Sequence, residues 1–419
     1  MRNSTWLLTV ALGLASTVTL VAGDWPQWRG LSGRGVAEAK DLPVTWSDTE
    51  HVLWKVPLPG RSHATPALWG ERLFVPSPDG ADLLLFCIST DGKVLWKKQV
   101  GTGNRLMGWN SKNNFATPSP VTDGKHVWIL VGSGDLACFD FDGNELWHRN
   151  LSKDHGPNTS DFGWGCTPLL YKDRLIIPCI HQRAESYVLA IDAATGKDVW
   201  KTMRPTSAQA ESRDAYSSPA VFEYPDGRAE AIVCAADVAT AYDVRSGDEV
   251  WRHGEINLTN NNSLRIIVSP VVTSELIYVT SAKNGPVHAV RPGGKGDVTK
   301  SHRAWTRLKL TPDISSPAVH DGLFFMVKEV GVVTCLDAKT GEEHWSERVG
   351  NGLFAPSPLV GDGKLYVTAE QGQVYVLAAD KQYKLLAKNE LGEFILASPV
   401  PTDGRLYFRT EKHLMCVGE

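Results

Sequence analysis

Residues 189–201 read Leu-Ala-Ile-Asp-Ala-Ala-Thr-Gly-Lys-Asp-Val-Trp-Lys, and this stretch indicates the fold. The apolar residues before Asp192 predict a short strand, the pair Thr195-Gly196 predicts a tight turn, and Trp200 lies on the strand that follows. The same order of Asp, a Gly turn and Trp returns at residues 241–251 and 335–345. Self-similarity of this kind indicates an architecture built from repeated units.

A Thr-Pro or Ser-Pro dipeptide marks the start of each predicted repeat. The prolines of these starts are Pro66, Pro118, Pro168, Pro219, Pro270, Pro317, Pro358 and Pro399. Their spacings are 52, 50, 51, 51, 47, 41 and 41 residues, so there are eight starts. Each start precedes a short strand, a turn such as Asp362-Gly363 and a second apolar strand such as residues 365–368. Four antiparallel strands per unit form the blade of a β-propeller.

Tryptophans on the fourth strands count the blades independently. Units one to six each have one, unit seven has Leu385-Leu386 there, and unit eight ends at Glu419 before any fourth strand. Residues 51–56 resemble residues 93–98 and supply the missing strand, which removes two free sheet edges. We therefore predict an all-β, eight-bladed β-propeller of four-stranded antiparallel blades, closed by an N-terminal strand in the last blade.

The quoted stretch resembles the repeat of the pyrroloquinoline-quinone-like (PQQ-like) propeller family. The matching positions are Ala190, Asp192, Thr195, Gly196 and Trp200. The opening at residues 24–30, followed by Leu42-Pro43 and Trp46, is similar to the start of exported bacterial members. In such repeats the Trp docks one blade on the next. The resemblance therefore implies a structural, blade-docking role for Trp54, Trp96, Trp147, Trp200, Trp251, Trp305 and Trp345.

Two kinds of relative define the functional alternatives that this resemblance implies. The quinoprotein dehydrogenases use an eight-bladed propeller to hold PQQ and calcium. The propeller lipoprotein that assists outer-membrane assembly resembles this chain in size, binds partners and has no cofactor.

The first 23 residues predict export rather than fold. Arg2 precedes a mostly apolar run, and Val21-Ala22-Gly23 offers small residues for cleavage. We predict a signal peptide at residues 1–23 and a single propeller domain at residues 24–419; an uncleaved membrane anchor is the alternative. No cysteine near the end of the run could accept a lipid. The predicted protein is exported, periplasmic or envelope-associated, not lipid-anchored, without a transmembrane segment after cleavage, and monomeric.

Charge argues against one class of partner, and cysteine positions argue against most disulfides. The chain has 43 Lys and Arg against 47 Asp and Glu, which gives no basic field for nucleic-acid binding. The seven cysteines mostly occupy small, apolar repeat positions, which indicates burial rather than pairing. A turn at Lys172-Asp173 would place Cys166 opposite Cys179, so a disulfide between these two stays open.

The quinone hypothesis asks for chemistry that the sequence does not display. No Cys-Cys pair occurs, and nothing orders the rim carboxylates into a calcium-binding pattern. Glycines such as Gly101 and Gly103 indicate turns. His63 and His155 lie in entry loops and are the two histidines that could take part in a site. We therefore assign no catalytic, cofactor-binding or metal-binding residue and predict no cofactor. PQQ with calcium remains the alternative, and an enzyme is less favoured than a binding protein.

Four long loops enter blades two to five and converge beside the central channel. Loops of such length commonly bind something or are mobile, and Trp, Tyr and Arg are typical of interface hot spots. The candidate interaction residues are Arg105, Trp109, Asn113, His155, Trp164, Arg213, Tyr216 and Arg265. We therefore expect a rim with a polar, aromatic wall on one side. The hypothesis is a non-enzymatic envelope scaffold that binds an unknown protein or small ligand there; the alternative is a PQQ-dependent alcohol or sugar dehydrogenase.

Overall fold

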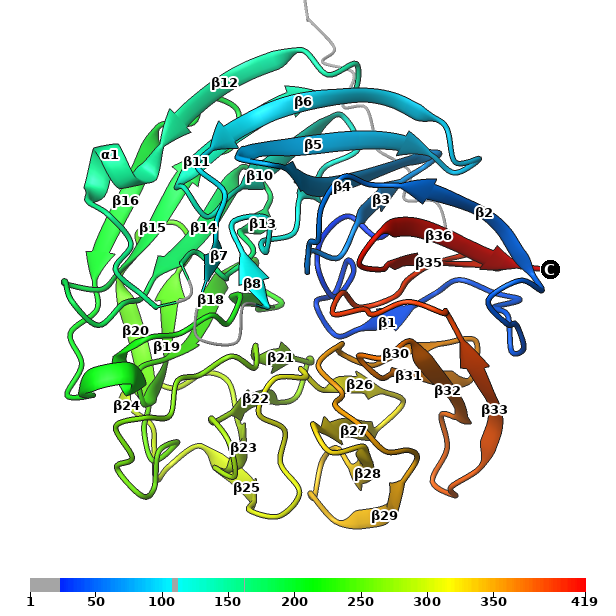
Figure 1. Cartoon of the computed structure of the whole chain (residues 1–419). Coiled ribbons are helices and arrows are strands. Elements are labelled where there is room, and N and C mark those ends of the chain that lie inside the picture. Colours follow the sequence, from blue (N-terminus) through cyan, green and yellow to red (C-terminus); the bar gives the residue numbers. More distant parts are fainter. Residues whose placement is uncertain (1–22, 108–111, 162) are drawn as a thin grey trace, which may run out of the picture.

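The strands form eight sheets arranged as blades around a central channel (Figure 1). The structure is a computed structural model that describes residues 23–107, 112–161 and 163–419. Within these residues every blade contains four antiparallel strands, which follow chain order in blades 1 to 7, and helix is limited to α1 (Leu151–His155) and the short 3-10 helix η1 (Ala210–Arg213). The predicted eight-bladed, all-β propeller is confirmed. The predicted signal peptide lies almost entirely outside the described residues.

The first half of the ring follows the chain from residue 67 to residue 253. Blade 1 consists of β3 (Ala67–Trp69), β4 (Arg72–Asp79), β5 (Asp82–Ser89) and β6 (Val94–Thr102). Blade 2 consists of β9 (Val121–Thr122), β10 (His126–Leu130), β11 (Asp135–Asp140) and β12 (Glu145–Asn150). Blade 3 consists of β13 (Leu169–Tyr171), β14 (Arg174–Cys179), β15 (Tyr187–Asp192) and β16 (Asp198–Met203). Blade 4 consists of β17 (Ala220–Glu223), β18 (Ala229–Ala235), β19 (Val238–Asp243) and β20 (Glu249–His253).

The second half of the ring runs to the C-terminus and then returns to the N-terminal part. Blade 5 consists of β21 (Val271–Val272), β22 (Ile277–Thr280), β23 (Val287–Val290) and β25 (Arg303–Arg307). Blade 6 consists of β26 (Ala318–His320), β27 (Leu323–Lys328), β28 (Val332–Asp337) and β29 (Glu343–Arg348). Blade 7 consists of β30 (Leu359–Gly361), β31 (Lys364–Thr368), β32 (Gln373–Ala378) and β33 (Leu385–Glu390). Blade 8 consists of β34 (Val400–Thr402), β35 (Arg405–Arg409), β36 (His413–Gly418) and β2 (Val52–Pro57).

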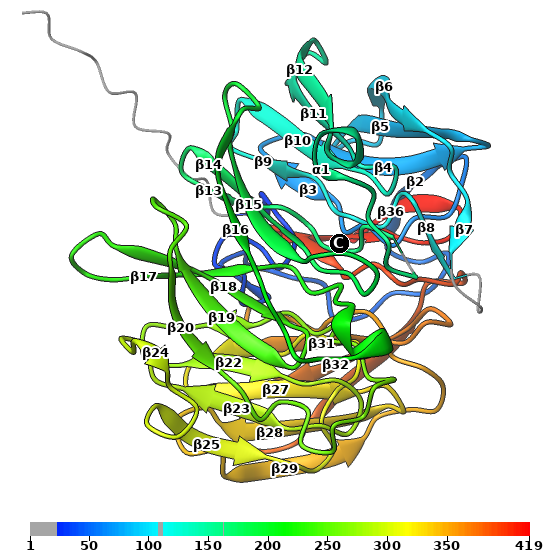
Figure 2. The same ribbon diagram turned by 90° about the vertical axis from the view of Figure 1, so that its left-hand side faces the viewer.

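In the described part of the chain, four short strands add to the eight blades. β1 (Val36–Ala37) adds to blade 7 beside β30, and β24 (Gly296–Asp297) adds to blade 4 beside β20, both in parallel. β7 (Leu106–Met107) and β8 (Asn113–Asn114) form a two-stranded ribbon in the connection between blades 1 and 2. Figure 2 shows this ribbon on one face of the ring and the β17 hairpin projecting from the opposite face. Among the described residues, no helix has the length and apolar character needed to span a bilayer.

The N-terminal strand closes the ring as predicted. β2 pairs antiparallel with β36, Trp54 lies opposite Cys416, and the Trp54 ring lies 5.8 Å from that of Tyr407. In Figure 1 the blue β2 lies beside the red C-terminal strands. Because the last strand of blade 8 comes from the start of the chain, the two ends of the ring are held together by a complete β-ladder.

A circle of hydrogen bonds joins the innermost strands of neighbouring blades. In each blade the hydroxyl of the residue before a proline accepts from the main-chain N–H of the equivalent residue one blade earlier, at 2.8–3.1 Å. The eighth bond runs from Ser398 N to Thr65 Oγ1 and completes the circle. We call these residues the hydroxyl belt: Thr65, Ser119, Thr167, Ser218, Ser269, Ser316, Ser357 and Ser398.

The belt corrects the predicted start of the second repeat. The predicted start was Thr117-Pro118, but Ser119, which precedes Pro120, accepts from Thr65 N and donates its own N–H to Thr167. The Thr117 hydroxyl instead donates to the carbonyl of Asn114 at 2.7 Å. Two adjacent Pro dipeptides carry the same local signal, and only the position of the neighbouring blades distinguishes them.

The Asp-x-x-Thr-Gly segment is a turn that Asp192 holds together. The Asp192 carboxylate accepts from the N–H and the O–H of Thr195 at 2.9 and 2.7 Å, and its main-chain carbonyl accepts from Gly196 N. Those hydrogen bonds, from the Thr195 side chain above all, lower the pKa of Asp192 although its partial burial opposes the shift. Asp337 and Thr340 repeat the arrangement in blade 6. The repeat motif is therefore a side-chain-stabilised turn between the third and fourth strands.

Tryptophans on the fourth strands contact this turn in the next blade. In each contact the indole Nε1–H donates to a main-chain carbonyl of the turn at 2.9–3.0 Å. The donors in the described residues are Trp54, Trp96, Trp147, Trp200, Trp305 and Trp345. A turn glycine faces the indole in most of these contacts; for example, Gly247 lies against Trp200. Trp251 differs, because its Nε1–H donates to Glu230 of its own blade at 2.8 Å.

The junction between blades 4 and 5, where Trp251 makes no such contact, contains a buried histidine pair. His253 Nε2 lies 2.7 Å from His288 Nδ1, and both side chains are fully buried. Burial lowers the pKa of His253 to about 4 and that of His288 to about 3, so the pair is uncharged at neutral pH. A neutral hydrogen bond therefore joins β20 to β23, where six of the other described junctions use an indole.

Gly247 and Gly227 provide a matched test of the tryptophan contact in blade 4. Both have a positive φ, +79° and +84°. A Cβ on Gly247 would lie 2.5 Å from Trp200, whereas one on Gly227 would meet nothing within 4 Å. We expect Gly227→Ala to cost about 1–2 kcal/mol through its backbone alone, and Gly247→Ala to cost about 1–3 kcal/mol more. Urea unfolding measures both, and equal losses would contradict the docking role of Trp200.

Candidate functional site in the central channel

The N-terminal segment forms the floor of the channel. Trp28 lines the channel cavity, and the neighbouring Arg29 is buried and donates to the carbonyls of Pro358 and Pro317 at 2.6 and 2.5 Å. Burial lowers the pKa of Arg29 to about 9. Because Pro317 and Pro358 directly precede the first strands of blades 6 and 7, Arg29 anchors the segment across one end of the channel.

The cavity above this floor has a volume of about 230 Å³. Its lower part is lined by hydroxyl-belt residues, and its upper part is lined by the residues two positions before each belt residue. Side chains at positions i and i−2 of an extended chain point the same way, which explains why both sets face the channel. We call the second set the upper layer: His63, Thr117, Gly165, Tyr216, Ile267, Ile314, Ala355 and Leu396.

The upper layer divides the cavity into a polar and an apolar wall. Blades 1 to 4 contribute His63, Thr117, a glycine and Tyr216, whereas blades 5 to 8 contribute aliphatic side chains only. In a ring of eight, blade 1 faces blade 5 and blade 4 faces blade 8, so the two walls face each other across the channel. This division concerns the lining of the cavity; the polar, aromatic wall expected on one side of the outer rim stays a prediction.

His63 is the titratable group of the polar wall. Its Nε2 atom is buried and has no hydrogen-bond partner among the described residues, whereas a side-chain hydrogen bond with Asn113 acts to raise the pKa of the ring. Burial lowers the pKa of His63 to about 3, and the positive charges of Arg61, Arg409 and Lys112 add to this effect. The imidazole is therefore neutral at physiological pH, and the electrostatic potential around it is positive.

Charged side chains surround the mouth of the cavity. Lys112, beside β8, pairs with the buried carboxylate of Glu370 at 2.6 Å and reaches from the blade 1–2 connection to blade 7. Arg265 lies 3.3 Å from Glu211 and also lines the cavity. Among the charged lining residues of the described chain, the two cations therefore exceed the one carboxylate, Glu370.

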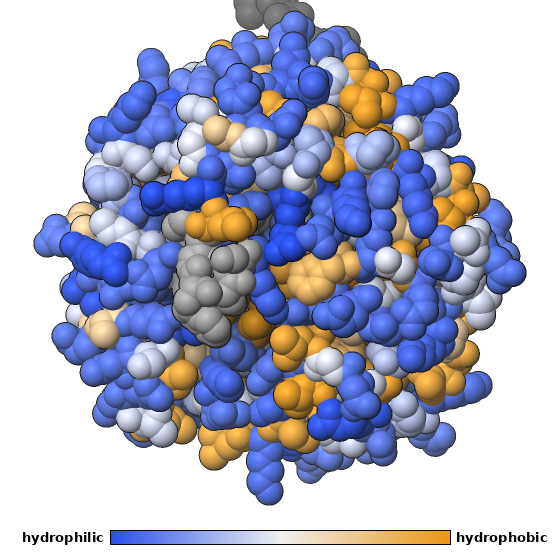
Figure 3. All heavy atoms as spheres, in the orientation of Figure 1, coloured by the Kyte–Doolittle hydropathy of each residue, from blue (hydrophilic) through white to orange (hydrophobic). Residues whose placement is uncertain are grey.

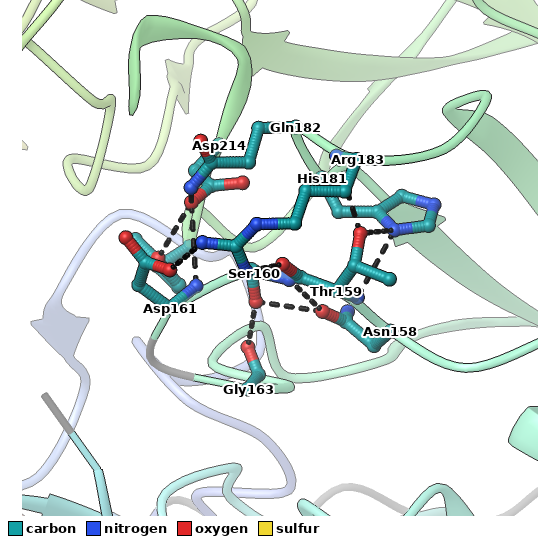
Figure 4. Close-up of polar contacts among 10 residues, drawn as sticks. Asn158, Thr159, Ser160, Asp161, Gly163, His181, Gln182, Arg183 and Asp214 are labelled. Atoms are coloured by element: carbon teal, nitrogen blue, oxygen red, sulfur yellow. Dashed lines mark hydrogen bonds and ion pairs between the residues drawn. The ribbon is translucent and has the colours of Figure 1, made fainter. Parts of the chain in front are cut away.

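Asp214 is the buried acid next to this mouth. Its Oδ2 accepts from Gln182 Nε2 at 3.1 Å, from the Tyr216 hydroxyl at 3.3 Å and from Asp161 N at 3.4 Å, while its Oδ1 is buried without a partner in the part of the chain that the structure describes. Burial raises the pKa of Asp214 to about 6. Figure 4 shows Arg183, from the loop between β14 and β15, bridging to Asp161 at 2.7 Å. The hydrogen bond from Asp161 N to Asp214 joins the loops that enter blades 3 and 4.

The structure brings together part of the predicted rim set. Asn113, Tyr216 and Arg265 line the cavity. Arg213 lies beside Asp214, and its Nη2 donates to the carbonyl of Ala184. These residues come from the entry loops of blades 2, 4 and 5, as expected of a shared rim.

The other predicted rim residues lie elsewhere. Trp164 is 2% exposed and packs in the core between blades 2 and 3, so it is not a surface residue of the rim. His155, at the end of α1, pairs with Asp198 on the outer strand β16 at 3.1 Å. Arg105 is exposed and lies 5.3 Å from the Phe115 ring. Trp109 lies outside the described residues.

Several lining groups escaped the sequence-based choice. Trp28 and Glu370 showed no signal of their own, and the belt hydroxyls were read only as the starts of repeats. The signal that could have found the upper layer is the register itself, since every member lies two residues before a belt residue. His63 was singled out as an entry-loop histidine, and it does line the cavity.

The cysteines are not part of the site. All seven are buried and free, including Cys166, whose Sγ–H donates to the carbonyl of Pro178. The β13–β14 hairpin has the predicted register, with Tyr171 opposite Arg174. Burial raises the pKa of the Cys166 and Cys179 thiols to about 12, which makes both unreactive.

The donor set of the cavity does not fit a calcium-bound quinone. Calcium takes six to eight oxygen ligands from carboxylates, main-chain and amide carbonyls and water. Glu370 is the one carboxylate in the described lining, and it is already paired with Lys112. Across residues 23–107, 112–161 and 163–419, no group of three or more His, Cys, Asp or Glu side chains is placed to hold a metal ion.

Comparison with known families relates the chain to one of them. The sequence model of the family described as outer membrane protein assembly factor BamB matches residues 35–163, 86–308 and 238–382. A serine/threonine-protein kinase, AfsK of Streptomyces coelicolor, is 29% identical over 197 residues, which are 45% of this chain and 19% of that protein. The chain thus spans about a fifth of the length of this curated relative.

Solved structures share the fold at low identity. BamB from Moraxella catarrhalis superposes with a TM-score of 0.65 and 15% identity, over 87% of this chain and 99% of that one. Quinohemoprotein alcohol dehydrogenase from Comamonas testosteroni gives 0.71 and 11%, over 96% and 82%. A europium-containing methanol dehydrogenase gives 0.68 and 11%, over 95% and 90%. At these identities the likeness shows the fold alone.

The pKa of Asp214 predicts a pH-dependent stability. Between about pH 4 and 6 the folded protein keeps a proton on Asp214 that the unfolded chain has released, so this group's contribution to stability falls as pH rises through that interval. We expect Asp214→Asn to remove this dependence: relative to wild type, the variant gains stability from pH 4 to 6 and then stays level. Urea unfolding from pH 4 to 8 measures it, and parallel profiles would contradict the assignment.

Proposed function

The chain belongs to the family described as outer membrane protein assembly factor BamB, and we propose from this membership that it is a non-enzymatic binding scaffold of the bacterial cell envelope. In this proposal the protein is exported, acts in the periplasm or at the envelope, and binds a protein or small ligand at the mouth of the channel. The kinase activity named for its curated relative has no counterpart in this proposal, because the match covers 19% of that protein.

The channel is closed at one end and open at the other, and this observation supports binding at the open face. Arg29 and Trp28 close the floor, whereas Lys112, Tyr216 and Arg265 surround the other end. Figure 3 shows the face with the mouth: most of it is hydrophilic, and apolar side chains gather next to its centre and below it, on the side of blades 5 and 6. A polar rim around an apolar centre is the usual composition of a protein-binding surface.

A PQQ-dependent oxidoreductase is the second candidate. The fold likeness to the two dehydrogenases favours it. The donor set speaks against it, because calcium would have to compete with Lys112 for Glu370. The two proposals predict different requirements: the oxidoreductase needs a bound cofactor for activity, whereas the scaffold needs its rim residues for partner binding.

A paired-variant experiment tests the scaffold. Tyr216→Ala with Arg265→Ala removes two rim groups, and Lys172→Ala with Arg228→Ala removes two exposed groups from turns on the opposite face. We expect the rim pair to lose at least tenfold of the crosslinking to envelope partners that wild type gives, and the control pair to retain it. Both pairs should remain folded by circular dichroism.

The same preparations test the oxidoreductase. PQQ with calcium should give wild type no large thermal shift and no dye-linked alcohol oxidation if the scaffold proposal holds. Quinone-dependent alcohol oxidation would overturn the scaffold, and so would undiminished crosslinking by the rim pair.

A further inference from the structure

The cavity below the rim has a division of polarity that the rim proposal does not use. His63 and Thr117 on one wall face Ile267 and Ile314 on the other, because blades 1 and 2 lie opposite blades 5 and 6. Two opposed walls of different polarity match a ligand with one polar and one apolar end. A cavity intended only to be filled by water would gain nothing from four aliphatic residues on one side.

An orphaned polar atom lies in the polar wall. His63 Nε2 is buried and lacks a hydrogen-bond partner within the described chain, which costs free energy unless something else meets it. The belt hydroxyls below it use their oxygens to accept main-chain N–H groups, so their hydrogens point to other acceptors. These hydroxyl hydrogens favour a ligand end that accepts hydrogen bonds.

The charged side chains near His63 determine which charge the polar end of the ligand should carry. Arg61, Arg409 and Lys112 make the potential at His63 positive, and their effect adds to burial in lowering the pKa of the imidazole. Arg61, Lys112 and Arg265 each lie against a carboxylate, of Glu411, Glu370 and Glu211 respectively. Arg409 is buried and, among the described residues, donates to main-chain carbonyls and Ser77 rather than to a carboxylate, so it leaves a net positive charge near His63. An anion is therefore favoured over a neutral or cationic group in the same position.

The volume sets the size of the ligand. An apolar protein cavity of about 150 Å³ holds a benzene molecule. The channel cavity, at about 230 Å³, has room for a ring of that size together with a short acidic side chain. Ala355, which is half-buried, has a small side chain and so leaves space on the apolar wall.

We propose that this cavity binds a small amphipathic carboxylic acid, with its carboxylate towards His63 and Lys112 and its apolar body against Ile267, Ile314 and Leu396. The ligand lies beneath the rim and above Trp28. The apolar contacts of this site, Ile267, Ile314 and Leu396, are not among the rim groups Tyr216 and Arg265 whose removal tests the envelope partner, so the two proposals can be tested separately.

Phenylacetate is the probe for the experiment, by calorimetric titration of the full chain at pH 7. A ligand of this size in a fitting cavity should bind with a Kd of about 1 mM or tighter. Phenylacetamide, phenylethylammonium and acetate each lack either the anion or the apolar body, and each should bind at least tenfold more weakly. Failure of phenylacetate to bind, or equal binding of the amide, would overturn the proposal.

Two variants locate the site. Ala355→Phe fills the apolar wall and should abolish binding, whereas Leu353→Phe, two residues earlier at a position that is 46% exposed, should leave it unchanged. Lys112→Met should weaken the acid at least tenfold and leave the weak binding of the amide unaltered. Unchanged phenylacetate binding by both Ala355→Phe and Lys112→Met would overturn the proposal. Crosslinking to the envelope partner is scored separately, so loss of one activity without the other shows which proposal has failed.

Discussion

Each blade meets the next at the channel through a hydrogen bond from a main-chain N–H to a hydroxyl of the belt, and the eighth bond returns to Thr65. Every belt residue precedes a proline, whose fixed φ and missing N–H limit the local backbone to an extended form. The belt therefore holds eight chain segments in one register around the axis. Because of that register, the residue two positions earlier always faces the channel, and the lining follows from the repeat.

The outer part of the ring is held by a second contact of a different kind. There an indole packs on a turn glycine and donates to a carbonyl of the next blade, as Trp200 does with Gly247 and Val244. This contact is replaceable: Trp345 packs on Tyr383 instead of a glycine, and the junction of blades 4 and 5 uses the pair His253 and His288. The belt has no such exception. The inner contact thus fixes the geometry, and the outer contacts adapt to the local sequence.

Much of the fold could be predicted, because each blade has its own local signals. The Gly turns, the fourth-strand tryptophans and the similarity of residues 51–56 to residues 93–98 predicted eight blades and their closure, and β2 pairs with β36 as expected. The start of the second repeat was wrong by two residues, since Thr117 and Ser119 both precede prolines. Local chemistry alone does not choose between them; the hydrogen bonds to neighbouring blades do.

The candidate site was predicted less well, because composition and loop length do not fix where a side chain points. Tyr216 and Trp164 both lie in long entry loops and both are aromatic. Tyr216 lies two residues before a belt residue and faces the channel, whereas Trp164 lies three before Thr167 and packs into the core. Parity relative to the belt, rather than residue type, decides the difference. Trp28 and Glu370 reach the cavity from distant segments, which no local pattern reveals.

Native-state hydrogen exchange at the belt amides tests this account most directly. If the circle of hydrogen bonds acts as one unit, the amides of all eight belt residues should exchange only through global unfolding, with free energies that agree within about 1 kcal/mol. Amides in exposed turns, such as that of Gly227, should exchange much faster. Exchange of single belt amides through local openings, with free energies that differ from blade to blade, would contradict the claim that the belt holds the ring together.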